Sequence, residues 1–369
     1  MRLAAGELRD KEELIWLAPV AAVSILLYIF AGVAGAPHGI STGAVIDDYG
    51  WKALKALPAL AQIGVLVLLV RALLSGSPNP LRRLLDPFRN RFGSPMLTAA
   101  LLAPIVLMPM LFTGFGVLKM LLPLSTPFAW DDTLAAADRA LFFGRPPWEL
   151  THALLGSVEA TAVIDRIYSG WVPLLSFAIL GFAFFAPRYD RARFFLSFTA
   201  AWLLLGVGGA YLGASAGPCY AALVGASSAP EFAPLMARLH AIAATPDVHI
   251  DAVRWQGVLW DAHVNQRYGF GMGISAMPSL HNAIAMLYAL ASFRFGRAWG
   301  AGGIAFALVI FIGSIHLGWH YAADGIVAAA AMACIWWAAG RYLERSGYAA
   351  AVSRSRAPDD VETPELALA

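Results

Sequence analysis

The segment from Gly273 to His281 combines residue types that suit phosphate binding. It reads Gly-Ile-Ser-Ala-Met-Pro-Ser-Leu-His and leads directly into an apolar stretch expected to be helical. The first N–H groups of a helix lack partners within the helix and carry the positive end of its dipole, which favours an anion. Ser279 adds a hydroxyl donor and His281 a titratable proton. The segment therefore predicts a phosphate-binding helix start with a proton donor beside it.

A second segment, from Ser314 to Asp324, places two titratable groups at helical spacing. His320 and Asp324 are four residues apart, so the carboxylate can accept from one imidazole nitrogen. The other nitrogen is then left as a nucleophile, as in other enzymes with covalent intermediates. We favour catalysis because ionisable residues at membrane helix ends are costly and mostly functional.

Two alternatives remain for these residues. His281, His320 and Asp324 are also compatible with a structural hydrogen-bonded network between helices. His316 and His320, four residues apart, are compatible with a metal or haem held from one helix. No further His, Cys or carboxylate set completes such a site, and the chain has 2 cysteines. We therefore predict neither a metal nor another cofactor.

The elements that carry these residues belong to a membrane protein. Of the 369 residues, 59% are hydrophobic and 14% are charged, and the mean hydropathy is +0.64. Apolar runs of about 18 or more residues can cross the hydrocarbon core as helices. Eight such runs lie near residues 14–36, 53–75, 97–122, 163–186, 194–215, 276–293, 298–316 and 322–342. The sequence predicts an all-α, polytopic transmembrane bundle. A net charge of +2, without basic runs interleaved with aromatic residues, argues against a nucleic-acid partner.

The distribution of Lys and Arg orients this bundle, because basic residues concentrate in cytoplasmic loops. With the N-terminus inside, 17 of the 26 basic residues fall in inner segments and nine in the longer outer ones. Both termini are then cytoplasmic, and both motifs open on the outer face. The outer segments 123–162 and 216–275 are expected to form a helical cap. Within them we predict a helix at Asp132–Phe143, lying in the interface plane, and another at Glu231–Ala244.

We divide the chain into three parts. Residues 1–95 are expected to hold two N-terminal membrane helices, the first a retained anchor, and a basic cytoplasmic loop. Residues 96–345 are expected to form a six-helix catalytic core that includes both outer loops. Residues 346–369 are expected to be a disordered cytoplasmic tail. Short loops and an Ala-rich composition favour a bacterial inner membrane, with the site on its periplasmic face.

Together the two motifs resemble those of the type-2 phosphatidic acid phosphatase superfamily. Its second motif reads Pro-Ser-Gly/Leu-His, matched by Pro278–His281, and its third ends in a His followed four residues later by Asp, matched by His320 and Asp324. The version found here is most similar to the branch that contains inositol phosphorylceramide synthase and its bacterial relatives. The resemblance implies that His320 attacks phosphorus to form a phosphohistidine. It also implies that Asp324 orients this histidine and that His281 protonates the leaving alkoxide.

Two cations of the superfamily pattern are missing. Its first motif, Lys-x6-Arg-Pro, is represented by Arg145-Pro146, but Asp138 stands where the Lys should be. An Arg expected six residues before the nucleophile is replaced by Ser314. The charge of a phosphate must therefore be balanced from elsewhere in the chain. The candidate substrate-binding residues are Ser279, Ser314, Lys119, Arg166 and Arg267.

The resemblance implies a membrane lipid phosphotransferase. Its substrate would be a phospholipid or polyprenyl phosphate drawn from the bilayer, and its acceptor a lipid alcohol. The alternative enzyme is a lipid phosphate phosphatase acting on phosphatidic acid or a polyprenyl diphosphate. A hypothesis from another class is a lipid transporter or binding protein that kept the fold and lost the chemistry.

Overall fold

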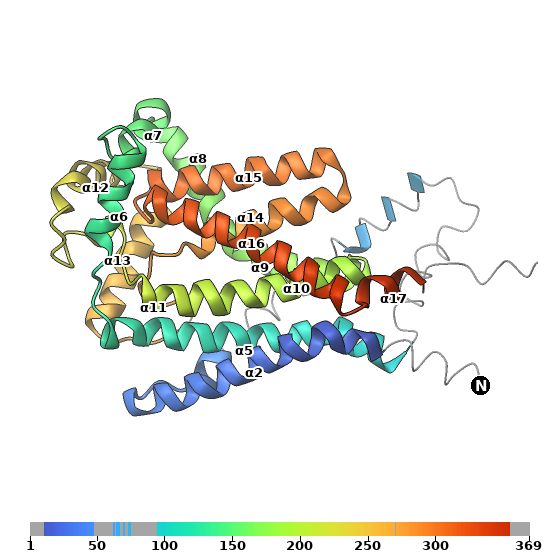
Figure 1. Ribbon diagram of the computed structural model, residues 1–369. Coiled ribbons are helices and arrows are strands. Elements are labelled where there is room, and N and C mark those ends of the chain that lie inside the picture. The colour runs from blue at the N-terminus through green and yellow to red at the C-terminus, as the bar shows by residue number, and fades with distance from the viewer. Residues whose placement is uncertain are drawn as a thin grey trace, which may run out of the picture.

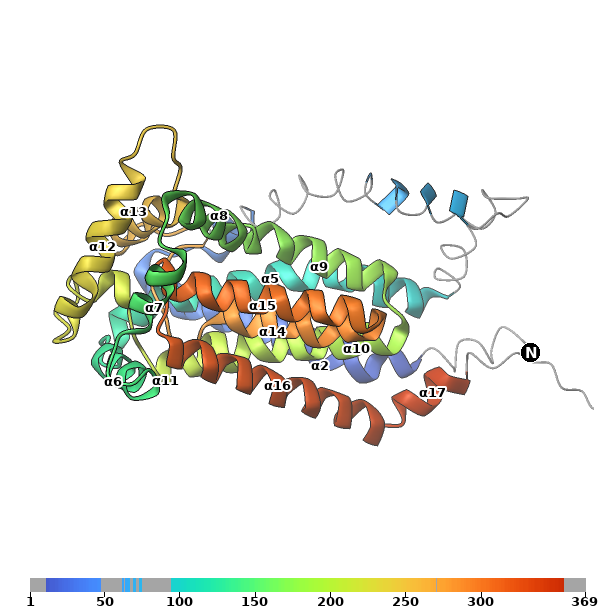
Figure 2. The ribbon, with the colours of Figure 1, turned by 90° about the horizontal axis from the view of Figure 1, so that it is seen from above.

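A computed structural model of the protein describes residues 11–47, 94–269 and 271–354, together with 62, 64–66, 69–70 and 73–74. Within these residues every regular element is a helix and no strand is present. The long helices run side by side, and shorter ones gather at one end of them (Figure 1; Figure 2). The helices are α2 (Leu14–Gly35), α5 (Pro95–Ser125), α6 (Asp131–Leu141), α7 (Pro147–Leu155), α8 (Val158–Ser169), α9 (Trp171–Phe185), α10 (Arg188–Ala201), α11 (Ala210–Leu212), α12 (Ala229–Ala243), α13 (Asp251–Val264), α14 (Leu280–Ser292), α15 (Arg297–His316), α16 (Ala322–Arg345) and α17 (Tyr348–Arg354). Shorter helical segments are Lys11–Glu13, Ala36–His38, Pro218–Tyr220, Phe293–Phe295 and the π-helix Trp202–Gly209 that joins α10 to α11.

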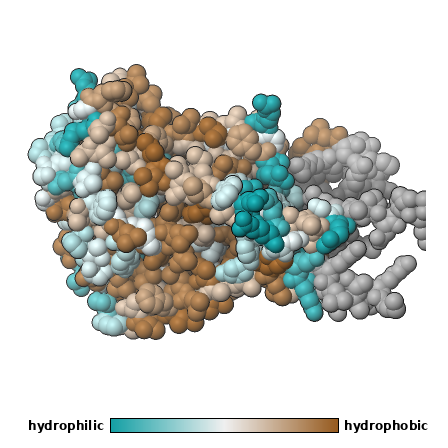
Figure 3. All heavy atoms as spheres, in the orientation of Figure 1, coloured by the Kyte–Doolittle hydropathy of each residue, from teal (hydrophilic) through white to brown (hydrophobic). Residues whose placement is uncertain are grey.

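Six stretches of the described chain are long and apolar enough to cross a membrane. They are Lys11–His38, Pro95–Ser125, Val158–Phe185, Arg188–Leu212, Arg297–His316 and Ala322–Arg345. Apolar side chains dominate the surface along the middle of the bundle, between two more polar ends (Figure 3). A belt of this kind suits the hydrocarbon core of a bilayer. The protein is an integral membrane protein with an all-α polytopic bundle, as predicted; the predicted crossing at 53–75 lies largely outside the described residues.

The helix expected at 276–293 is shorter than predicted. Helix α14 begins at Leu280, because Ser279 has extended backbone angles and its Oγ accepts a hydrogen bond from the N–H of Asn282. Residues 276–279 therefore form a turn rather than a first helical turn. The 13 residues of α14 are too few to span the hydrocarbon core. The helix is instead buried against α15 and α16 in the centre of the bundle (Figure 1).

Small residues in the α10–α11 stretch let the turn before α14 pack closely. A Cβ atom at Gly209 would lie 2.7 Å from Cγ of Pro278, and one at Gly206 would lie 3.0 Å from Leu280. Neither glycine can therefore carry a side chain without a shift of its neighbour. These close approaches hold the turn of the first motif against the interior of the bundle.

Four short helices, α6, α7, α12 and α13, form a cap over the end of the bundle where α14 and α16 begin (Figure 1; Figure 2). The helices predicted in the outer segments are present as α6 and α12. The expected apolar face of α6 is only partly buried, because Leu134 is 4% exposed but Leu141 is 53% exposed. Two carboxylates, Asp131 and Asp138, share the buried face with Leu134. Their backbone partners, described below, explain why α6 packs in this way.

At the opposite end of the bundle, the start of the chain meets its C-terminal part. The hydroxyl of Tyr348, which is fully buried, donates to Oε1 of Glu13 at 2.9 Å. Arg188 also donates to this oxygen, at 2.6 Å. The prediction of a disordered tail from residue 346 is therefore wrong for Tyr348–Arg354, which form α17, because a buried tyrosine and an ion pair offset the entropy of ordering them. Residues 355–369 lie outside the described part of the chain.

Candidate active site

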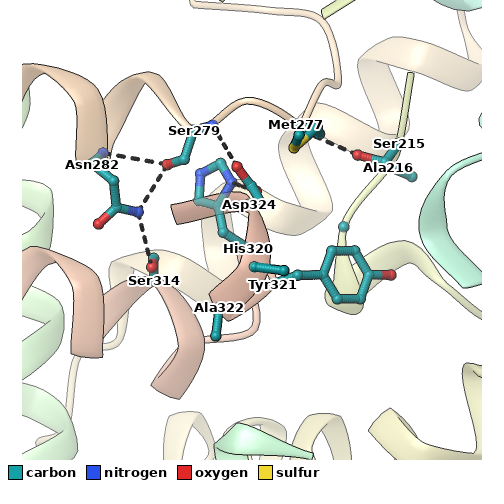
Figure 4. A network of polar contacts seen from close by, with 12 residues as sticks. Ser215, Ala216, Met277, Ser279, Asn282, Ser314, His320, Tyr321, Ala322 and Asp324 are labelled. Carbon is teal, nitrogen blue, oxygen red and sulfur yellow. Dashed lines mark hydrogen bonds and ion pairs between the residues drawn. The ribbon is translucent and has the colours of Figure 1, made fainter. Parts of the chain in front are cut away.

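The two motifs meet where the start of α14 faces the start of α16. Asp324, in the first turn of α16, is fully buried and accepts from both sides (Figure 4). Its Oδ1 accepts the backbone N–H of Ser279, and its Oδ2 lies 2.8 Å from Nδ1 of His320. Because an ionised carboxylate only accepts hydrogen bonds, Nδ1 must carry the proton in this contact. Nε2 is then the nitrogen of His320 with a lone pair.

His281 lies beside His320 and packs against two aromatic rings. The ring centroids of the two histidines are 5.7 Å apart. The imidazole of His281 stacks on Trp171 at 4.2 Å and on Tyr168 at 4.8 Å, with interplanar angles of 29° and 9°. Both aromatic residues stand where α8 meets α9, and within the described chain neither Tyr168 Oη nor Trp171 Nε1 has a hydrogen-bond partner. The arrangement fixes the plane of the His281 ring and leaves two donors unused near it.

A third group of polar residues braces the start of α14. The side-chain amide of Asn282 donates to Oγ of Ser279 at 3.0 Å and to Oγ of Ser314 at 3.2 Å (Figure 4). The Ser314 hydroxyl donates in turn to the carbonyl of Phe311 at 2.8 Å. Ser279 and Ser314 are both fully buried. Ser314, predicted to bind substrate, is therefore occupied in tying α15 to α14, and Asn282 is a member of the site that the sequence did not reveal.

The three predicted cations differ in their surroundings. Lys119 lies near the outer end of α5, close enough for its charge to act on His281. A Cβ atom at Gly273 would lie 2.9 Å from the Lys119 carbonyl oxygen, so the first motif packs directly on this part of α5. Arg267 is largely exposed and pairs with Asp261 at 3.2 Å. Arg166 is exposed on the last turn of α8. Of the three cations, Lys119 is the one whose charge acts on His281, while Arg166 and the paired Arg267 have exposed side chains.

Carboxylates of α6 hold the segment that follows His320. Asp138 accepts the N–H groups of Ala322 at 2.9 Å and Ala323 at 2.7 Å. Burial raises the pKa of Asp138 to about 6, the two N–H donors oppose the rise, and the nearby Asp324 charge adds to it. Asp131 accepts the hydroxyl of Tyr321 at 2.9 Å, and burial raises its pKa as well. The sequence identified Asp138 only as the residue that replaces a lysine.

The imidazole of His316 contacts residues of α7 and α8. Its Nε2 lies 3.0 Å from Oγ1 of Thr161 and its Nδ1 lies 3.3 Å from Oγ1 of Thr151. Its ring stacks on His152 with 4.0 Å between centroids. Both nitrogens of His316 are therefore engaged with cap-side hydroxyls. The described residues contain no group of three or more His, Cys, Asp or Glu residues arranged to hold a metal ion, so the alternative of a metal shared by His316 and His320 finds no support in the geometry.

Comparison with known families agrees with this geometry. The family model described as the PAP2 superfamily matches residues 132–339, which is more than half of the chain. The chain belongs to the PAP2 superfamily. The matched region runs from α6 into α16 and contains both motifs and the cap. No curated protein and no solved structure matches the chain significantly. PAP2 superfamily members are phosphatases and phosphotransferases, so membership supports phosphate ester chemistry on lipids in general.

Proposed function

We propose that this PAP2 protein is a membrane lipid phosphotransferase that works through a phosphohistidine at His320. The observation that carries the proposal is the position of Asp324, which links the Ser279 backbone to the His320 ring. This pairing leaves Nε2 of His320 for attack on phosphorus. The 5.7 Å between the His281 and His320 rings allows one phosphoryl group to contact both.

In the proposed reaction, Nε2 of His320 forms a bond to phosphorus while the bond from phosphorus to the leaving oxygen breaks. His281 donates a proton to that oxygen, so that the product leaves as an alcohol. The carboxylate of Asp324 stabilises the positive charge on the phosphorylated ring. A lipid alcohol then gives its proton to His281 and attacks phosphorus, which restores His320. The scheme balances without a metal or another cofactor.

The phosphate would lie between the start of α14 and the outer end of α5. The N–H of Ser279 is taken by Asp324 and that of Asn282 by the Ser279 hydroxyl. The N–H groups of Leu280 and His281, in the first helical turn, are the ones that we assign to the phosphate oxygens. Lys119 is the cation that we propose to balance their charge. We assign Arg166 and Arg267, whose side chains are exposed, to contacts with neighbouring lipid headgroups.

Transfer to a lipid alcohol is favoured over hydrolysis by the two departures from the superfamily pattern. The Asp138 carboxylate caps α16 where the pattern has a lysine, and Ser314 bonds to Asn282 where the pattern has an arginine. Both departures are shared with the inositol phosphorylceramide synthase-like branch that the motifs resemble. Family membership also supports a lipid phosphate phosphatase, which would use water in the second step.

We also propose that the cap faces the periplasm of a bacterial inner membrane, with both termini in the cytoplasm. Lys11 and the arginines that begin α10 and α15 lie at the end of the bundle opposite the cap. Basic residues concentrate on the cytoplasmic side of membrane proteins, which supports this orientation. A phospholipid or polyprenyl phosphate would then reach the site from the outer leaflet.

The test is an assay of phosphate release and headgroup exchange on a panel of lipid phosphates, with purified protein in EDTA. His320→Ala and His281→Ala are expected to abolish both activities, and Lys119→Met to weaken binding of the phosphate. His240→Ala, at an exposed histidine of the cap, is the matched control. Transfer to an added lipid alcohol identifies a phosphotransferase, and release of phosphate alone identifies a phosphatase. Activity that survives His320→Ala would overturn the mechanism, and lipid binding without turnover would indicate a transporter or binding protein.

A further inference from the structure

The loop that carries His320 is held from outside the bundle. Three outer elements form hydrogen bonds with its backbone carbonyls. His152 of α7 contacts the carbonyl of His316 at 2.8 Å, and Gln256 of α13 donates to that of Leu317 at 2.8 Å. The backbone N–H of Cys219 donates to the carbonyl of Gly318 at 2.9 Å. These outer elements therefore hold the loop in addition to its own backbone bonds, such as that from His320 N–H to the Ser314 carbonyl.

A further contact, made by Asp138 of α6, differs in kind from these three. Asp138 offers a buried carboxylate to two consecutive N–H groups, those of Ala322 and Ala323, at the positive end of α16. These residues lie between His320 and Asp324. A carboxylate that accepts from two N–H groups at once fixes both the position and the direction of a helix start.

We propose that Asp138 is a positioning residue of this enzyme, holding the first turn of α16 so that Asp324 meets both His320 and the backbone of Ser279. This inference rests on the proposed role of His320. If the start of α16 shifted, the two oxygens of Asp324 would lose their alignment with donors that come from two different helices. Misplacement by about 1 Å costs on the order of a hundredfold in rate in well-organised sites.

Two groups on neighbouring elements face Asp138, namely the Asp324 carboxylate and the Tyr321 hydroxyl. Neither group is a cation, so neither of them balances the negative charge of Asp138. The two N–H donors are its main favourable contacts, and burial raises its pKa to about 6. Protonation leaves only one oxygen as a good acceptor, which would loosen one of the two bonds to α16.

The experiment compares Asp138→Asn with two carboxylates that cap other helices. Asp165 is equally buried and accepts the N–H groups of Asp251 at 2.7 Å and Ala252 at 2.9 Å. Asp132, next to Asp131 on α6, accepts from Ser228 at 2.8 Å. An asparagine has one acceptor oxygen, so each substitution removes one cap bond of the same kind. Thermal unfolding of the three purified variants measures how much stability each one loses with its cap bond.

We expect Asp138→Asn to lower kcat about tenfold to a hundredfold with little change in KM, because the displaced groups act on phosphorus rather than on the lipid. It should also remove the ionisation near pH 6 from the pH dependence of kcat, while Asp132→Asn and Asp165→Asn keep it. Asp138→Glu, which retains two acceptor oxygens, should restore part of the rate.

An unchanged kcat in Asp138→Asn, or an equal fall in all three variants, would overturn the positioning role. His320→Ala separates this result from a failure of the proposed function. If His320→Ala is inactive while Asp138→Asn behaves like the unaltered protein, only the role of Asp138 fails. If His320→Ala remains active, the proposed nucleophile itself is wrong.

Discussion

Replacing Asp324 with asparagine is the sharpest test of the proposed mechanism. The residue is fully buried, and its two oxygens have different partners, the N–H of Ser279 and Nδ1 of His320. An asparagine of the same shape must point its carbonyl toward the N–H of Ser279, because the reverse orientation would set two donors against each other. Its amide N–H then faces Nδ1 of His320.

The substitution would therefore move a proton within the imidazole. Nδ1 becomes an acceptor, Nε2 carries the hydrogen, and the lone pair required for attack on phosphorus is lost. A comparable change in a catalytic triad with a buried aspartate costs about 10⁴-fold in kcat, equivalent to ~5 kcal/mol of barrier. We expect a loss of that order in Asp324→Asn, with a folded protein because the bond to Ser279 is retained.

The assay is single-turnover labelling with a radioactive phosphate donor. The unaltered enzyme should accumulate label in an acid-labile, base-stable form, as expected for a phosphohistidine. Asp324→Asn should show no early burst of label, while Asp132→Asn, the same chemical change on an exposed carboxylate, should label normally. A kcat within tenfold of the unaltered protein, or an undiminished burst, would refute the assignment of Nε2 as the nucleophile.

Three further predictions follow from contacts around the site. Trp171→Leu removes a ring stacked at 4.2 Å on His281 and should lower kcat about tenfold, whereas Trp171→Phe should stay within threefold in the same assay. Gly273→Ala places a Cβ 2.9 Å from the Lys119 carbonyl at a backbone φ of 91°, and should lower thermal stability by about 1–3 kcal/mol. Because the pKa of Asp138 is raised from 3.8 to about 6 in the folded protein, its contribution to stability, ~3 kcal/mol, is complete below pH ~3.8 and is lost as the pH rises through 6. Denaturant titrations of the unaltered protein and of Asp138→Asn should differ in this direction, and stability that instead falls on acidification would contradict it.

Protonation of Asp138 is expected to raise the stability of the protein and to lower its activity, and both effects have a common origin. Protonation relieves the cost of a buried charge, which favours the folded state, but it also weakens one of the two bonds that align α16. A protein that becomes more stable and less active between pH 7 and pH 5 would show both effects. In this respect the site resembles others in which strict placement of a catalytic group is maintained at a cost in stability.

In the proposed mechanism, the cap contributes by holding the chain segment that carries His320. The α6 carboxylate of Asp138, the α7 imidazole of His152 and the α13 amide of Gln256 bond to the backbone around His320, and Asp131 of α6 accepts the Tyr321 hydroxyl. The loop between α15 and α16 also has backbone bonds of its own, from Trp319 and His320 to the Ser314 carbonyl. Because outer elements add to these bonds, alterations in those elements should change turnover more than lipid binding.

Much of the fold follows from local sequence patterns. Apolar runs of membrane length predicted the all-α bundle, and those runs within the described residues correspond to helices. The start of α14 was misplaced because the apolar pattern does not show that Ser279 caps the helix through Asn282. The helix at Tyr348–Arg354 was missed because the partner of its buried tyrosine, Glu13, lies 335 residues away.

The sequence by itself singled out His281, His320 and Asp324 as candidate catalytic residues, from two motifs and from the four-residue spacing of His320 and Asp324. Only the tertiary structure decided which residues surround them. It tied Ser314 to Asn282, stacked Tyr168 and Trp171 on His281, and set Asp138 on a helix start 184 residues away. The physical reason is that His320 and Asp324 are four residues apart across the start of α16, so a short stretch of chain brings them together. A side chain that bonds to the backbone of a distant helix leaves no periodic trace in the sequence on either side.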